Sequence, residues 1–139
     1  MTPPEAPVQG QIGRGAEMPP AVSVRLEVLA KRADFLRAAQ ARRHGTGGFL
    51  LQARQRRADE ADAALIRVGY TCSKKLGNAV ARNRAKRRLR EIARAILPRQ
   101  GQPGWDYVLV GRPEATAARD FALMLADMER ALAQIHAKR

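Results

Sequence analysis

The side chains in this sequence that most clearly suit a specific chemistry are the positive charges between positions 74 and 94. The stretch SKKLGNAVARNRAKRRLREIAR begins at Ser73, and from Lys74 onward it carries nine Lys or Arg residues and one acid, Glu91. Such a charge density suits a polyanion, and nucleic acid presents phosphates in a regular array. Arg outnumbers Lys by six to three, and a planar guanidinium can bind a phosphate bidentately or stack on a base. The residue types therefore favour contact with structured RNA.

A solvated helix face is the alternative explanation for these charges. A helix stabilised by surface ion pairs would place acids four residues from its bases, and this segment offers only Glu91. Like charges repel by roughly a few tenths of a kcal/mol per pair, a cost that a bound phosphate array offsets. Lys74 and Lys75 would widen the positive patch around the helix N-terminus, where unpaired backbone N–H groups also attract anions.

The same stretch predicts a helix from about Ala79 to Leu97. Gly77 permits a positive φ, Asn78 is a suitable N-cap, and Pro98 is expected to stop the helix. Apolar residues at helical spacing form one narrow stripe that can pack on a sheet: Ala85, Leu89, Ile92 and Ile96. Basic residues spaced four apart follow one flank: Arg82, Lys86, Arg90 and Arg94. Asn83 and Arg87 face away from the stripe.

A small sheet is predicted to position this helix. Residues 29–41 have the spacing of a short helix, residues 48–56 and 64–72 have strand character, and the acidic residues 58–63 predict a solvated connection. Residues 104–112 predict a buried strand, and from Ala117 an apolar helical face follows. The order is helix, two or three strands, helix, strand, helix. The predicted fold class is therefore α+β, a small two-layer sandwich of helices on a sheet.

Length and composition limit the organisation of the chain. We predict a disordered Pro/Gly-rich tail over residues 1–25 and a single RNA-binding domain over residues 26–139. The formal net charge of +13 points to nucleic acid or an acidic membrane surface. No apolar run approaches the roughly 20 residues that span a bilayer, and Cys72 is the sole cysteine. We expect a cytoplasmic protein without a membrane partner.

Few residues suggest catalysis by the protein itself. Cys72, His44 and His136 are too scattered to predict a nucleophile or a zinc site, and we interpret Cys72 as a small core residue. Trp105 is interpreted as a packing residue. The acids of the C-terminal part form no spaced pair and are interpreted as surface residues that aid solubility: Asp106, Glu114, Asp120, Asp127 and Glu129. The sequence therefore predicts no catalytic residue, no protein-bound metal and no protein-bound cofactor.

Residues 67–94, RVGYTCSKKLGNAVARNRAKRRLREIAR, resemble the signature of the protein component of bacterial ribonuclease P. The centre of that signature is Arg-Asn-Arg followed by Lys-Arg and a further Arg. KRADFLRAA resembles the family's first helix and WDYVLVGRP its late strand, so the similarity covers about residues 29–139. The resemblance implies an αβββαβα sandwich of the ribosomal-protein S5 domain 2-like type, with a left-handed crossover through the Arg-Asn-Arg helix. The general rule for parallel strands would favour the right-handed form.

The resemblance also implies the role of an accessory subunit in an endoribonuclease. The family's protein binds a catalytic RNA, and the holoenzyme removes the 5′ leader of precursor tRNA in a Mg²⁺-dependent cleavage. The RNA carries the chemistry and binds most of the Mg²⁺, and no obligate protein partner is expected. The rival interpretations are a basic ribosomal or other structural RNA-binding protein without a leader groove, and a protein-only nuclease, which would need clustered carboxylates or a histidine pair.

By position, the resemblance implies two sets of RNA-binding residues. The first would contact the catalytic RNA: Lys74, Lys75, Arg82, Asn83, Arg84, Lys86, Arg87 and Arg90. The second would form a groove between the first helix and the sheet that accepts the single-stranded leader: Phe35, Leu50 and Gln52. Base stacking on an aromatic ring is tolerant of sequence. Ala39 and Gln52 stand where the family often has aromatics, so leader binding would depend more on charge here.

Overall fold

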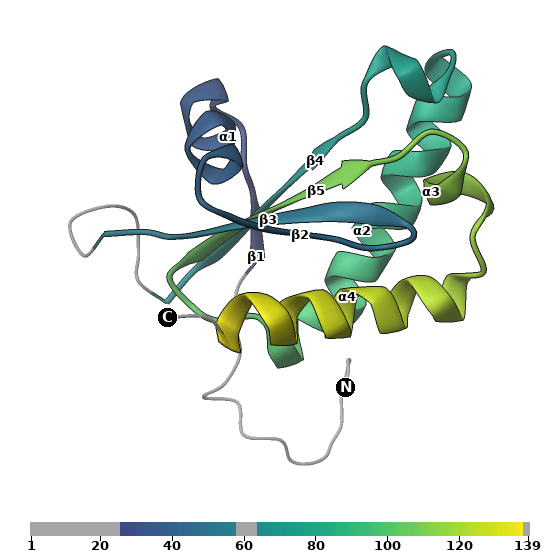
Figure 1. The fold of residues 1–139 in the computed structure, drawn as a ribbon. Coiled ribbons are helices and arrows are strands. Elements are labelled where there is room, and N and C mark those ends of the chain that lie inside the picture. Colours follow the sequence, from purple (N-terminus) through teal and green to yellow (C-terminus); the bar gives the residue numbers. More distant parts are fainter. Residues whose placement is uncertain (1–25, 58–63, 138–139) are drawn as a thin grey trace, which may run out of the picture.

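The computed structural model describes residues 26–57 and 64–137, and its centre is a mixed five-stranded sheet (Figure 1). The strands are β1 (Leu26–Val28), β2 (Arg42–Gly45), β3 (Phe49–Gln55), β4 (Ile66–Thr71) and β5 (Trp105–Gly111). They lie in the order β1-β4-β5-β3-β2. β4 is parallel to β1 and β5, whereas β3 is antiparallel to β2 and β5. The predicted tail (residues 1–25) and acidic connection (residues 58–63) lie outside the described residues.

Helices lie on both faces of this sheet (Figure 1). One face carries α1 (Arg32–Ala39), and the opposite face carries α2 (Ala79–Gln100) and α4 (Phe121–Ala137). Two short elements, η2 (Lys74–Leu76) and α3 (Ala115–Ala118), precede the two long helices. The predicted α+β architecture is confirmed, and each predicted helix and strand is present.

The main hydrophobic core lies between the sheet and the pair α2 and α4. Alternate residues of the central strands, such as Leu51, Val68 and Tyr107, pack there against Leu89 of α2 and Met128 of α4. A smaller cluster of Leu29, Ala38 and Val108 lies under α1. Each face of the sheet therefore has its own packing, and most of the apolar burial occurs on the α2 side.

The turn into α2 follows the sequence prediction. Gly77 adopts a φ of 128°, which a residue with a Cβ rarely adopts, and the Asn78 side chain accepts a hydrogen bond from the backbone N–H of Ala81 at 2.9 Å. α2 then returns across the sheet and leads into β5, the parallel neighbour of β4 (Figure 1). This is the connection for which the family resemblance implied a left-handed crossover.

Several element boundaries differ from the prediction. α1 begins at Arg32 rather than near position 29, because Leu29 extends the pairing of β1 and donates to the carbonyl of Val68 at 2.9 Å. Pro98 does not stop α2, which ends at Gln100. Proline removes only one hydrogen bond this near a helix end, and the N–H of Gly101 closes the last turn on Leu97 at 2.8 Å.

The sequence pattern does not predict two of the strands, β1 and β2. β1 is three residues long, and β2 has the sequence RRHG, which lacks any apolar alternation. β2 is set by its partner, since Arg43 pairs with Gln52 and Gly45 with Leu50 in an antiparallel hairpin.

Candidate nucleic-acid interface

The basic residues of α2 lie outside the apolar stripe that packs on the sheet. The predicted apolar stripe is buried, and Ala93 and Leu97 widen it. Asn83, Arg84 and Arg87 are exposed. The other predicted basic residues of α2 are half-buried along the flank: Arg82, Lys86 and Arg90. None of these basic side chains forms an ion pair with a residue that the structure describes, so their charges are available to an external anion.

The N-terminus of α2 adds further positive groups to this surface. Lys74 and Lys75 are exposed in η2, and the Ser73 side chain accepts a hydrogen bond from the N–H of Lys75 at 3.4 Å. Val80, in the first turn of α2, is 69% exposed and borders a shallow hollow with Asn83, Arg84 and Arg87. We call residues 74–75 together with the exposed side of residues 80–90 the basic flank. The structure brings all eight predicted catalytic-RNA contacts onto it.

Arg88 belongs to the same helix but has a structural role. Its guanidinium donates hydrogen bonds to the carbonyls of Thr116, Ala117 and Arg119 at 2.7–2.9 Å, and it lies 5.6 Å from the centre of the Phe121 ring. These contacts fix α2 to α3 and to the residues that lead from α3 into α4. Arg88 is therefore a tertiary link, and charge alone could not have separated it from its neighbours.

The three predicted groove residues lie on the α1 side of the sheet. Leu50 and Gln52 of β3 stand opposite Val110 and Val108 of β5, whose side chains face α1. Phe35 of α1 lies directly over Gly69, where any Cβ would come within 2.5 Å of the ring. Phe35 and Leu50 are half-buried, but Gln52 is only 9% exposed. Phe35 and Leu50 can thus contact a ligand, and Gln52 forms the floor.

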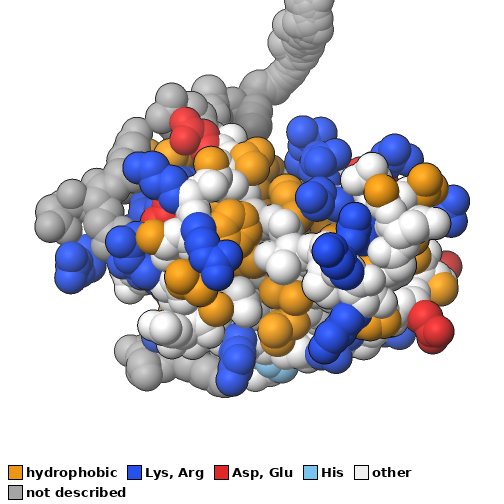
Figure 2. Space-filling model, turned by 90° about the horizontal axis from the view of Figure 1, so that it is seen from above, with side chains coloured by type: hydrophobic (Ala, Val, Ile, Leu, Met, Phe, Trp, Pro, Cys, Tyr) orange, Lys and Arg blue, Asp and Glu red, His pale blue; other side chains and the backbone are white. Residues whose placement is uncertain are grey.

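Figure 2 shows the molecule from the α1 side. Hydrophobic side chains gather near the middle of this face, and Lys and Arg side chains lie on both sides of them. Leu36, on α1, is 50% exposed and adds to the apolar surface next to Phe35. An apolar centre with positive borders suits a single strand of nucleic acid, whose bases stack and whose phosphates need countercharge.

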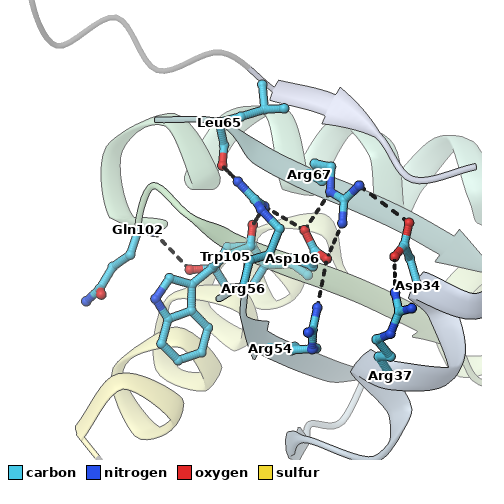
Figure 3. A network of polar contacts seen from close by, with 10 residues as sticks. Asp34, Arg37, Arg54, Arg56, Leu65, Arg67, Gln102, Trp105 and Asp106 are labelled. Atoms are coloured by element: carbon cyan, nitrogen blue, oxygen red, sulfur yellow. Dashed lines mark hydrogen bonds and ion pairs between the residues drawn. The ribbon is translucent and has the colours of Figure 1, made fainter. Parts of the chain in front are cut away.

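A buried ion-pair network supports this face from below (Figure 3). The Asp106 carboxylate is fully buried and accepts hydrogen bonds from Arg56 at 2.7 Å and from Arg67 at 2.7 and 2.8 Å. Arg54 lies 3.9 Å away from it. Arg67 also contacts Asp34 of α1 at 3.4 Å. The network therefore links β3, β4 and β5 to the helix that carries Phe35.

The prediction that Asp106 lies at the surface is wrong. The signal was present in the sequence, because an acid within a strand predicted to be buried requires a charged partner. The prediction is also wrong for Asp127, which is fully buried and bonded to Arg119 at 2.8 Å and Arg130 at 2.8 Å. The remaining three acids are exposed as predicted: Glu114, Asp120 and Glu129.

Cys72 and Trp105 have packing roles. Cys72 is half-buried beside the main core, and burial raises the pKa of its thiol. Trp105 is buried, as predicted. Within residues 26–57 and 64–137, no group of three or more His, Cys, Asp or Glu side chains is placed to hold a metal ion. Nor does any described helix combine the length and apolarity needed to cross a membrane.

A family model and the related proteins found by comparison all point to the same protein family. The model of the Ribonuclease P family matches residues 24–136. The ribonuclease P protein component of Ruegeria pomeroyi is 63% identical over 124 residues, which cover 86% of this chain and 98% of that protein. The corresponding protein of Paramagnetospirillum magneticum is 45% identical over 117 residues, covering 84% and 87%.

Solved structures agree with this result. The RNase P protein of Staphylococcus aureus matches with a TM-score of 0.60 and 27% identity, over 78% of this chain and 95% of that one. The RNase P protein of Thermotoga maritima matches with a TM-score of 0.58 and 25% identity, over 81% and 98%.

Proposed function

The chain belongs to the ribonuclease P protein family, and from this premise we propose that it binds the catalytic RNA through the basic flank and the 5′ leader of precursor tRNA through the α1 face. A protein component of ribonuclease P is an accessory part of an endoribonuclease that processes tRNA. We propose that the RNA performs the cleavage and that this protein positions and holds its substrate.

One observation supports the division of roles most directly. The cations of the basic flank have no ion-pair partner among the described residues, whereas the α1 face combines an aromatic ring, apolar side chains and a positive border. The first composition suits phosphates of a folded RNA, and the second suits an unstructured strand. A ribosomal protein would need only the first surface.

The described carboxylates bear on where Mg²⁺ would bind. Asp34, Asp106 and Asp127 are each bonded to arginines, so their oxygens are already occupied. These three carboxylates offer no free oxygen ligand to Mg²⁺, and the described residues include no group of three or more His, Cys, Asp or Glu side chains placed to hold a metal ion. We therefore propose that the RNA holds the Mg²⁺ and that the protein binds no cofactor of its own. From the family we also propose that the protein requires no obligate protein partner and works in the cytoplasm.

The decisive experiment adds the purified protein to ribonuclease P RNA at low Mg²⁺ and follows cleavage of precursor tRNA. We expect strong stimulation, because the protein's cations would replace part of the countercharge that Mg²⁺ otherwise supplies. Absence of stimulation, with folded protein and RNA that is active at high Mg²⁺, would refute the proposal. Cross-linking from position 35 to the leader would separate it from the ribosomal-protein alternative.

A further inference from the structure

A small notch lies at the β1 edge of the sheet, separate from the α1 face. Its border combines apolar, aromatic and basic residues: Leu26, Glu27, Val28, Val68, Tyr70, Arg90 and Arg94. Neither the predicted leader groove nor the predicted catalytic-RNA contacts account for Tyr70, Arg94 or Val28.

The strand register shows on which side of the sheet the notch opens. Leu26 and Val28 pair with Ile66 and Val68, two core residues on the α2 side. Because strand residues alternate, Tyr70 shares that side. Glu27 instead pairs with Arg67, whose side chain points toward α1. The notch therefore opens toward α2, and the carboxylate of Glu27 belongs to the other face of β1.

Among the residues that the structure describes, the charged side chains facing the notch are two cations from α2, Arg90 and Arg94. The guanidinium carbon of Arg90 lies 5.9 Å from the centre of the Tyr70 ring. Arg94, one turn later, is exposed, and neither arginine forms an ion pair with a described residue. Burial raises the pKa of the Tyr70 hydroxyl more than Arg90 and Arg94 lower it, so the ring carries no negative charge to neutralise them.

An exposed apolar side chain completes this site. Val28 is 69% exposed at the sheet edge, beside the half-buried Tyr70. A free guanidinium suits a phosphate, and an apolar wall with a ring and a second guanidinium suits a base. Separately, each feature is ordinary. Together in one notch they match the two halves of a nucleotide.

We propose that this notch holds one unpaired nucleotide of the catalytic RNA, with the base against Val28, Tyr70 and Arg90 and the phosphate on Arg94. The inference rests on the proposed function and extends it. The catalytic RNA is favoured over the leader because Arg90 also belongs to the basic flank, so the two sites are continuous. The leader would lie on the opposite face, over Phe35.

Two substitutions and a matched control test this site in the full chain. Tyr70→Leu keeps an apolar side chain but removes the ring, so affinity for ribonuclease P RNA should fall about 5- to 100-fold, with no change in the salt dependence. Arg94→Gln should reduce the slope of log affinity against log salt by roughly 0.7–0.9, because one phosphate contact is lost. Arg99→Gln removes an equal charge from an exposed residue of α2 outside the notch and should change affinity less than about twofold.

Thermal unfolding of each variant shows whether it is folded, and Arg94→Gln tests the site even if Tyr70→Leu is unstable. If both variants bind RNA as Arg99→Gln does, the notch does not hold a nucleotide. A photo-cross-linker at Val28 should attach to the catalytic RNA; attachment to the leader or to a protein would overturn the assignment. If the wild-type protein stimulates cleavage but all variants bind the RNA equally well, this inference is wrong and the proposed function still stands.

Discussion

Asp106 shows most clearly how a single residue supports the α1 face. Its fully buried carboxylate accepts hydrogen bonds from Arg56 and Arg67, and Arg56 in turn donates to the carbonyls of Leu65 at 2.6 Å and Trp105 at 3.1 Å. A charge out of water is tolerated only when its partners are in place. Removing this charge takes one negative partner away from the buried Arg56 and from Arg67.

We predict that Asp106→Asn lowers the free energy of unfolding by about 3–5 kcal/mol, the usual cost of breaking a buried ion pair from one side. Urea unfolding followed by circular dichroism measures the change. Asp120→Asn, at an exposed acid, is the matched control and should lie within about 0.5 kcal/mol of wild type. Equal stability of the two variants would show that the network contributes little.

His136 couples stability to pH. Tyr107 receives a hydrogen bond from the N–H of Gln102 at 2.9 Å, so its own proton is free to be donated to Nε2 of His136 at 2.7 Å, which suits the neutral imidazole. Burial, and secondarily the charge of Arg42, lower the pKa of His136 below its ordinary value of about 6.5. The unfolded chain therefore takes up the proton first as pH falls.

Because the pKa of His136 is lower in the folded protein than in the unfolded chain, we predict that the free energy of unfolding decreases as pH falls below about 6.5. Unfolding in this pH range is linked to proton uptake by His136. The decrease should end once pH passes below the lowered pKa of the folded state. Urea unfolding at several pH values between about 5 and 8 measures it, and His136→Gln should flatten this part of the curve. A variant curve as steep as that of wild type would assign the effect to other groups.

At the scale of elements, α2 combines two kinds of arginine. Arg84 is exposed and has no ion-pair partner among the described residues, whereas Arg88 is bonded to three carbonyls near α3. We predict that Arg84→Ala weakens binding to ribonuclease P RNA and makes its salt dependence shallower by roughly 0.7–0.9, with an unchanged melting temperature. Arg88→Ala should lower the melting temperature by several degrees, since about 1 kcal/mol corresponds to roughly 4–8 °C in a small domain.

Salt titrations of RNA affinity and thermal unfolding of both variants distinguish these roles. The reverse result would contradict this assignment: Arg84→Ala would be destabilised, and Arg88→Ala would be impaired only in RNA binding.

The sequence could predict α2 well because its signals are local. Asn78 caps the helix, Gly77 permits the turn, and the buried stripe has strict helical spacing. β1 and β2 depend instead on partners distant in sequence, since Leu26 pairs with Ile66 and Arg42 with Ala53. The role of Arg88 likewise depends on carbonyls about 30 residues away. Long-range pairing, rather than weak propensity, limited the prediction.

At the scale of the molecule, the sheet lies between the two surfaces that we propose to bind RNA. Side chains of β3 and β5 that face α1 form the floor under Phe35, and their neighbours in sequence pack against α2 on the other side. The family resemblance implied both surfaces by position in the sequence, yet it placed Gln52 as a contact where the fold nearly buries it. Because the surfaces lie on opposite faces, a substitution on one should leave the other functional.

This separation yields a prediction about leader length. Phe35→Leu keeps apolar packing over Gly69 but removes the ring that a base would stack on, so the holoenzyme should bind precursor tRNA with a leader of about eight nucleotides some 5- to 100-fold more weakly. A precursor with a leader of about one nucleotide cannot reach along the α1 face and should bind as it does to wild type. The control is Leu123→Ala, which changes an exposed apolar residue of α4 on the face of the sheet opposite α1. It should leave the binding of both precursors unchanged. Binding measured under conditions that do not permit cleavage isolates affinity from cleavage. An equal loss for both leaders would instead place Phe35 in the scaffold, and an accompanying loss of affinity for the catalytic RNA alone would contradict the separation of the two faces.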